Sequence, residues 1–204
     1  MPSKYRLRYI FKPIIRVIAK GLIKIRVSPN LATVLMLGFS ILSFISIGFY
    51  ENLLLFSLFV FITGIMDGCD GVIARLTNKS TKFGAFFDSV MDRISEFFIF
   101  FGLYIFRKAQ YLWNLFDMKL IIIITFLASI MISYARTRGE NFHKGDFDIG
   151  LMARSERLFY LVVTMMLSFF WNFTNEFLFL FMVLVLSTFI FRTIKIYKFI
   201  RKGD

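Results

Sequence analysis

Long runs of uncharged, mostly apolar residues limit what this chain can fold into. The runs are residues 31–50, 52–66, 97–106, 120–135, 158–175 and 177–191. A helix that crosses a bilayer needs about 17–25 mostly apolar residues, and residues 31–50 supply that length without a charge. Most of the other runs reach it only if their helices continue into neighbouring charged residues. We therefore predict an all-α integral membrane protein with six transmembrane helices.

The segment before the first run alternates basic and apolar side chains. Five of its basic residues recur at every fourth position: Arg8, Lys12, Arg16, Lys20 and Lys24. A helix with this pattern can lie in the membrane surface with its charges toward the lipid head groups, although an ordinary solvated helix face is the alternative. We expect residues 1–30 to form an amphipathic interfacial helix and residues 31–204 to form the six-helix transmembrane domain.

The net charge is +12, and the positions of the basic residues along the chain fit a membrane topology. Lys and Arg gather in the cytoplasmic segments of membrane proteins. With the N-terminus inside and six crossings, all 25 Lys and Arg residues except Arg107, Lys108 and Lys119 lie on the inner side. We therefore expect a multi-pass protein of the plasma membrane with both termini in the cytoplasm, and we expect no nucleic-acid partner.

Charged residues also occur inside the expected helices. Asp92 falls in the first half of a helix expected over residues 84–106, and Glu96 falls near its middle. A charge at the centre of a bilayer costs at least about 2.5–3.5 kcal/mol, so such residues face a bundle interior or a wet cavity. We predict a polar cavity that opens to the cytoplasm.

Four aspartates are spaced to converge in this cavity. Asp67 and Asp70 are three residues apart, and Asp88 and Asp92 are four apart, so each pair shares a helix face. Four carboxylates repel one another unless cations hold them, and hard oxygen ligands suit Mg²⁺ or Mn²⁺. Four carboxylates can hold two ions about 3.5–4 Å apart, as in two-metal phosphoryl chemistry.

Intramembrane carboxylates also mark ion pathways, so a metal or proton transporter is an alternative from another class. The charges gather toward one side of the membrane, whereas a conduit needs polar groups through its full thickness. A lipid-binding protein without catalysis is a third possibility, and the complete set of metal ligands argues against it.

The stretch from Asp67 to Asp92 reads D-x2-D-G-x2-A-R-x8-G-x3-D-x3-D, and it resembles the signature of the CDP-alcohol phosphatidyltransferase family. The resemblance implies that Asp67, Asp70 and Asp88 ligate two metal ions and that Asp92 completes the site and acts as general base. It implies a CDP-lipid site made by the following residues: Asp67, Gly71, Ala74, Arg75 and Gly84. It also implies a homodimer, and release of CMP when the acceptor hydroxyl attacks the lipid-side phosphorus.

A second group of charges bears on the acceptor. Four arginines lie at the end of the fourth expected helix or at the start of the fifth: Arg136, Arg138, Arg154 and Arg157. Guanidinium groups bind a phosphate through paired hydrogen bonds, so a phosphorylated acceptor would account for them. The segments resemble the branch of archaetidylinositol phosphate and phosphatidylinositol phosphate synthases.

That resemblance implies CDP-archaeol or CDP-diacylglycerol as donor and myo-inositol 1-phosphate as acceptor. Glycerol 3-phosphate is the alternative acceptor, because it also carries a phosphate. The arginines could instead pair with Glu140 and Glu156 as ordinary loop charges.

Overall fold

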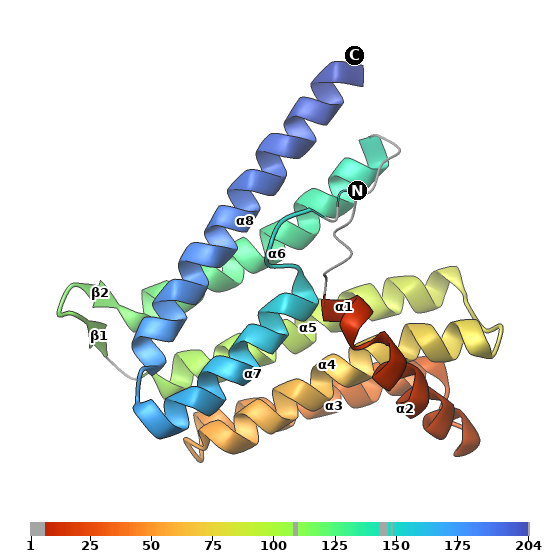
Figure 1. Cartoon of the computed structure of the whole chain (residues 1–204), viewed down its shortest axis with the longest axis horizontal. Helices are drawn as coiled ribbons and strands as arrows, with labels where there is room; N and C mark the ends of the chain where they lie inside the picture. The colour runs from red at the N-terminus through yellow and green to blue at the C-terminus, as the bar shows by residue number, and fades with distance from the viewer. Residues whose placement is uncertain (1–6, 108–109, 143–146, 148, 204) are drawn as a thin grey trace.

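The computed structural model describes residues 7–107, 110–142, 147 and 149–203 (Figure 1). The first six residues of the expected interfacial segment, and Lys108, lie outside the described residues. The elements in chain order are α1 (Leu7–Ile10), α2 (Lys12–Lys24), α3 (Pro29–Gly48), α4 (Leu53–Leu76), α5 (Lys82–Phe106), β1 (Tyr111–Leu112), β2 (Phe116–Asp117), α6 (Met118–Phe142), α7 (Arg154–Trp171) and α8 (Thr174–Gly203). Apart from one short hairpin, the described regular structure is helical, as the sequence predicted.

The six long helices, α3 to α8, alternate in direction along the molecule (Figure 1). Within the described residues, α3, α4, α6 and α8 are long and apolar enough to cross a membrane. Helices α5 and α7 do not meet that standard of length and composition, because α5 carries charges through its first half and α7 begins with three charged residues in four.

Side-chain caps fix where the helices begin. The Ser28 hydroxyl accepts a hydrogen bond from the backbone amide of Leu31 at 3.2 Å, and Pro29 is the first helical residue of α3. The Thr81 hydroxyl accepts from the amide of Gly84 at 2.9 Å in the same way. Such caps satisfy amides that have no partner within the helix. Helices α3 and α5 therefore begin at Pro29 and Lys82, two residues before the starts expected at residues 31 and 84.

Close packing of α3 against α4 and α5 fixes the part of the bundle that carries the aspartates. Gly102 of α5 lies so near α3 that a methyl group there would approach Ile47 Cγ2 to 2.6 Å and the Phe44 backbone to 3.1 Å. Helix α7 packs on α4, whereas α6 packs chiefly on α8. Helices α6 and α8 diverge from the rest toward the upper right of Figure 1.

Helix α2 lies across the polar end of α4. Ala19 is buried there with Cys69 and Ile73, and the Cys69 thiol contacts the Ile15 carbonyl at 3.8 Å. Gly68 allows this approach, because a methyl group at that position would lie 2.6 Å from Ile15 Cδ1. Within the segment expected to form an interfacial helix, the structure has the helix Lys12–Lys24, and its role as a helix in the membrane surface stays a prediction.

The hairpin at the opposite end was not predicted. Tyr111 pairs with Asp117, and Leu112 pairs with Phe116. The turn needs positive φ at Trp113, and the Trp113 ring packs on Phe179 with the centroids 5.6 Å apart.

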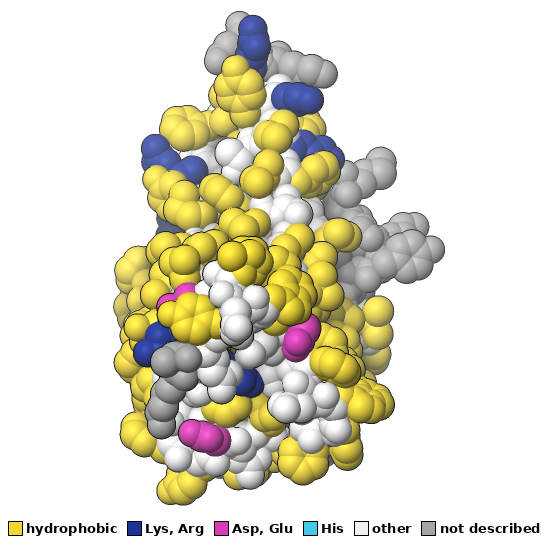
Figure 2. Space-filling view, turned by 90° about the vertical axis from the view of Figure 1, so that its left-hand side faces the viewer, with side chains coloured by type: hydrophobic (Ala, Val, Ile, Leu, Met, Phe, Trp, Pro, Cys, Tyr) yellow, Lys and Arg dark blue, Asp and Glu magenta, His cyan; other side chains and the backbone are white. Residues whose placement is uncertain are grey.

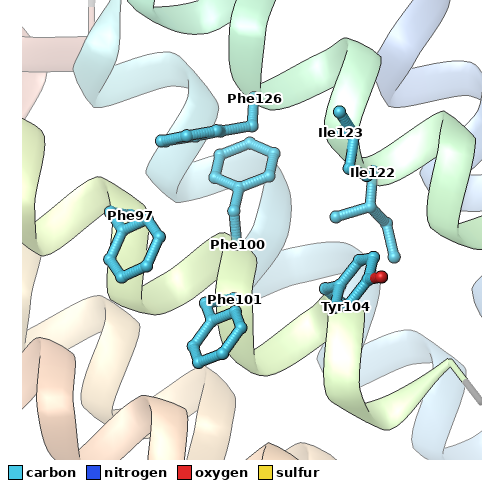
Figure 3. Close-up of a pocket in the computed structure, with 7 residues that line it drawn as sticks. All are labelled: Phe97, Phe100, Phe101, Tyr104, Ile122, Ile123 and Phe126. Atoms are coloured by element: carbon cyan, nitrogen blue, oxygen red, sulfur yellow. The ribbon is translucent and has the colours of Figure 1, made fainter.

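The surface is strongly apolar. Figure 2 views the end of the molecule that carries the hairpin, and hydrophobic side chains cover most of this face. Lys and Arg side chains gather toward the top, where α8 ends. A cavity between α5 and α6 is lined only by aromatic and aliphatic side chains: Phe97, Phe100, Phe101, Tyr104, Ile122, Ile123 and Phe126 (Figure 3). It offers no charged group, so the chemistry must lie elsewhere.

Candidate active site

Helices α4 and α5 both pack on α3, and together they carry three of the four predicted metal ligands to one place. Asp67, Asp88 and Asp92 each offer a carboxylate oxygen, and these oxygens all lie within 4.8 Å of one another. Asp70 is buried beside them and lines a cavity together with Asp88. The Thr33 hydroxyl of α3 donates to Asp70 Oδ2 at 2.9 Å, so α3 fixes the orientation of this carboxylate.

The cluster fits a divalent metal ion. Asp88 Oδ1 is buried and accepts no hydrogen bond from any residue that the structure describes. A buried carboxylate oxygen without a donor is costly, and a bound cation would satisfy it. Carboxylate oxygens on two rigid helices are the hard ligands that Mg²⁺ and Mn²⁺ take.

Arg154 lies inside the acidic cluster. It is the first residue of α7, and its Nη1 atom makes ion pairs with both Asp67 and Asp92. Its Nη2 atom donates to the Ser95 hydroxyl at 3.1 Å. The sequence predicted that Arg154 would bind the acceptor; its contacts in the structure are with the carboxylates.

Arg157 is buried one turn further along α7, with only 1% of its surface exposed. Its Nε and Nη2 atoms lie 3.0 and 2.9 Å from Glu96 Oε1, and Nη1 donates to the Met152 carbonyl at 3.0 Å. The Ser129 hydroxyl donates to the same Glu96 oxygen at 2.5 Å. A buried polar network therefore joins α5, α6 and α7, one helical turn beyond Asp92.

The other two arginines lie on the last turns of α6. Arg136 makes an ion pair with Glu140 at 2.8 Å, with both side chains more than a third exposed. The Arg138 guanidinium lies 4.9 Å from the centre of the Phe142 ring. The pairing of Arg136 with Glu140 is the one that the loop-charge alternative predicted, whereas Glu156 accepts a hydrogen bond from Ser155 at 2.8 Å.

Two cavities of different character adjoin the carboxylates. A polar cavity is lined in part by Asp70, Gly71, Ala74, Arg75, Gly84 and Asp88. An apolar cavity between α2, α4 and α7 is lined in part by Phe11, Ile15, Phe61, Gly64, Leu158, Phe159 and Asp67. The acidic cluster contributes Asp67 to the apolar lining and Asp88 to the polar lining, so each cavity has a carboxylate of the cluster in its wall.

Two glycines, Gly71 and Gly84, are part of the lining of the polar cavity. A methyl group on Gly71 would lie 3.4 Å from Arg75 Nη1, and one on Gly84 would lie 3.1 Å from the Thr81 hydroxyl and 3.6 Å from Asn30 Oδ1. A methyl group at Gly84 would therefore crowd the Thr81 hydroxyl, whereas one at Gly71 would meet only the flexible end of Arg75.

A comparison with known protein families agrees with the motif and with the acidic cluster. The sequence model of the CDP-alcohol phosphatidyltransferase family matches residues 26–194. This chain belongs to that family. The enzyme is therefore a transferase of phospholipid biosynthesis with membrane helices, and the transporter alternative is not favoured.

Individual relatives point to one branch of the family. The archaetidylinositol phosphate synthase of Pyrococcus horikoshii is 33% identical over 147 residues, which cover 72% of this chain and 73% of that protein. The crystal structure of Mycobacterium tuberculosis phosphatidylinositol phosphate synthase with CDP-DAG bound is 25% identical, with a TM-score of 0.76 over 91% of this chain and 94% of that one. The same synthase in complex with manganese and citrate gives 25% identity and a TM-score of 0.77 over 90% and 88%.

Proposed function

We propose that this enzyme transfers the phosphatidyl or archaetidyl group of a CDP-linked lipid to a hydroxyl of myo-inositol 1-phosphate and releases CMP. One observation carries the proposal: carboxylates of a single cluster line both a polar and an apolar cavity. A CDP-lipid has the same division, because a polar nucleotide and apolar chains are joined through a diphosphate. The diphosphate is the group that metal ions between the cavities would bind.

The proposed metal ligands are Asp67, Asp70, Asp88 and Asp92. Two divalent ions, Mg²⁺ or Mn²⁺, would supply electrostatic stabilisation of the charge that develops on the phosphates. The manganese complex of the mycobacterial relative supports a divalent metal. Thr33 prepares the site by holding the Asp70 carboxylate in place.

Asp92 is the proposed general base. Its carboxylate accepts the proton of the acceptor hydroxyl as that oxygen forms a bond to the lipid-side phosphorus. The bond from this phosphorus to the bridging oxygen breaks, and CMP carries the electron pair away. Asp92 suits the role because it lies on the rigid α5 helix beside Asp67 and Asp88.

The polar cavity is the proposed site of the nucleotide. Gly71, Ala74, Arg75 and Gly84 line it, and with Asp67 they form the predicted CDP-lipid site. Arg75 supplies positive charge for the diphosphate, and the two glycines leave space for it. The mycobacterial relative with CDP-DAG bound supports a CDP-lipid donor.

The proposed acceptor site lies between the end of α6 and the start of α7. Arg136, Arg138 and Arg154 can turn guanidinium groups toward a phosphate there. Arg157 is held in the interior by Glu96, so we assign it the role of positioning α7 rather than phosphate contact. Glycerol 3-phosphate is the less favoured acceptor, because the relatives named above are inositol phosphate lipid synthases.

The membrane placement is part of the proposal. All six long helices would cross the bilayer, with the charged ends of α5 and α7 facing the shared interior rather than lipid. The interfacial segment (residues 1–30) would lie on the cytoplasmic leaflet of the plasma membrane and precede the six-helix catalytic domain (residues 31–204). Both termini and the active site would then be cytoplasmic, and the enzyme would be a homodimer.

An acceptor panel tests the function. Purified enzyme with Mg²⁺ and CDP-archaeol or CDP-diacylglycerol is given myo-inositol 1-phosphate, glycerol 3-phosphate, free inositol or serine, and CMP release is measured. We expect release with inositol phosphate and little with free inositol, since the arginines need a phosphate to bind. Release with glycerol 3-phosphate alone would move the enzyme to the other branch, and no release with any acceptor would refute the proposal.

We expect the apolar cavity to hold a hydrocarbon chain of the donor lipid. Gly64 lines it, and a methyl group there would lie 3.7 Å from Leu158 Cδ1. A Gly64→Phe substitution would fill the space that the chain needs. We expect the KM for a long-chain CDP-lipid to rise about tenfold or more, a loss of about 1.4 kcal/mol in binding, while the KM for chainless CDP-glycerol stays within about twofold.

The matched control is Gly38→Phe on the exposed face of α3, where a methyl group would meet nothing within 4 Å. This variant should leave both KM values unchanged. An equal rise for both donors in Gly64→Phe would show that the cavity does not hold the chain.

A further inference from the structure

Arg154 is held by acidic groups on one side of its guanidinium. Nη1 contacts Asp67 and Asp92, and Nη2 contacts the Ser95 hydroxyl. Its Nε atom is buried and makes no hydrogen bond to any described residue. The guanidinium therefore depends on the two carboxylates, and its side chain is 16% exposed, so little of it is in contact with solvent.

A metal ion and this guanidinium need the same oxygen atoms. Asp67 and Asp92 are among the three carboxylates that can hold a cation together, and Arg154 Nη1 pairs with an oxygen of each. We propose that Arg154 is the exchangeable counter-ion of the catalytic centre: it neutralises Asp67 and Asp92 in the metal-free protein, and a divalent ion displaces it. The proposal rests on the metal centre assigned above, and it makes the displaced guanidinium available to the phosphate of the acceptor.

The exchange needs only a side-chain movement, because the backbone before Arg154 is fixed. The Met152 amide donates to the Thr188 hydroxyl of α8 at 3.2 Å. The Met152 carbonyl accepts from Arg157 Nη1 at 3.0 Å, and Arg157 is itself paired with buried Glu96. The start of α7 thus stays in place while the long Arg154 side chain rotates.

Arg93 provides a matched comparison. Its Nη1 atom lies 3.9 Å from Asp92 Oδ2, and its side chain is 36% exposed. It therefore contributes the same charge to one of the same carboxylates, and it also donates to the Ser89 carbonyl of its own helix. Because it lies beside Asp92 and is in contact with solvent, its field is screened and it does not occupy the space between Asp67 and Asp92.

The test measures Mn²⁺ binding to purified protein that has been stripped with EDTA, by electron paramagnetic resonance, without any substrate. For Arg154→Met we expect the Kd for Mn²⁺ to fall about tenfold or more, because the competing cation is gone; tenfold is about 1.4 kcal/mol. We also expect its Tm in EDTA to fall below that of the wild type, and saturating Mn²⁺ to restore most of the loss. Arg93→Met should change the Kd by no more than about threefold.

Arg154→Lys keeps the positive charge. It tests whether misfolding, rather than loss of the charge, changes the Kd for Mn²⁺ in Arg154→Met. We expect its Tm in EDTA to be close to that of the wild type and its Kd to lie between those of the wild type and Arg154→Met. Unchanged or weaker Mn²⁺ binding by Arg154→Met, with binding intact in the wild type, overturns the counter-ion proposal alone. A wild-type protein that binds no Mn²⁺ overturns the metal centre as well, so the two failures are distinguishable.

Discussion

Replacing Asp92 with Asn is expected to lower the kcat of CMP release by about 100- to 10,000-fold, the usual contribution of a positioned general base. Asn has nearly the same shape but cannot accept the proton of the acceptor hydroxyl. Its amide oxygen can still contact a metal ion, so the loss should exceed any change in Mn²⁺ affinity. The measurement is the rate of CMP release at saturating donor and acceptor, with the Kd for Mn²⁺ determined on the same preparation.

The control for this prediction is Asp117→Asn in the hairpin. Asp117 accepts a hydrogen bond from the Lys119 amide at 2.8 Å, and it lies at the opposite end of the molecule from the aspartates of α4 and α5 (Figure 1). This variant should retain the wild-type kcat. An Asp92→Asn enzyme with normal turnover would contradict the assignment of the base.

The second large effect is expected from the buried network around Glu96. Glu96 is 3% exposed and Arg157 is 1% exposed, and Arg157 Nη2 lies 2.9 Å from Glu96 Oε1. Either Glu96→Gln or Arg157→Met therefore leaves one buried charge without its partner. Breaking a buried pair in this way costs about 3–5 kcal/mol. We expect either variant to lower the Tm of the purified protein strongly and to shorten its half-life in detergent.

Two comparisons make this prediction specific. Glu140→Gln breaks an ion pair of similar length with Arg136 on an exposed face, and such pairs contribute about 0–1 kcal/mol. The double variant Glu96→Leu with Arg157→Met removes both buried charges and should recover much of the stability that the single variants lose. Single variants as stable as the wild type would show that the network does not hold α5, α6 and α7 together.

Much of the site could be predicted because its parts are local in sequence. The aspartate pairs lie three and four residues apart on adjacent helices, so helical periodicity alone predicts that they converge. The structure groups Asp67, Asp88 and Asp92 and sets Asp70 beside them. The pair Arg136–Glu140 has the same helical spacing, and it also forms.

The parts that could not be predicted depend on contacts between distant segments. Arg154 and Asp67 are 87 residues apart, and Arg157 and Glu96 are 61 apart. Nothing in the local pattern tells which arginine faces the carboxylates and which is buried, because that depends on how α7 is rotated against α4 and α5. The four arginines therefore read as one phosphate-binding group, whereas the structure separates them into the acidic cluster, the interior and the end of α6.

The helix boundaries and the hairpin were also predicted incompletely from the sequence. The apolar runs mark where helices are buried, whereas Ser28 and Thr81 mark where they begin, and these polar caps lie outside the runs. The hairpin depends on positive φ at Trp113 and Asn114; Asn favours such a turn, but Trp does not. The long apolar runs correctly predicted six long helices in this order along the chain, because each run is part of one helix.

The most direct test of the proposed reaction is to follow the phosphorus atom that is attacked. CDP-lipid labelled with ³²P only at the lipid-side phosphate is incubated with the enzyme, Mg²⁺ and myo-inositol 1-phosphate, and lipid and water-soluble products are separated. We expect the label to enter a new inositol-containing lipid and the cytidine to appear as unlabelled CMP. Label released with the nucleotide as CDP would mean that a different bond is broken, and it would contradict the transfer reaction proposed for this site.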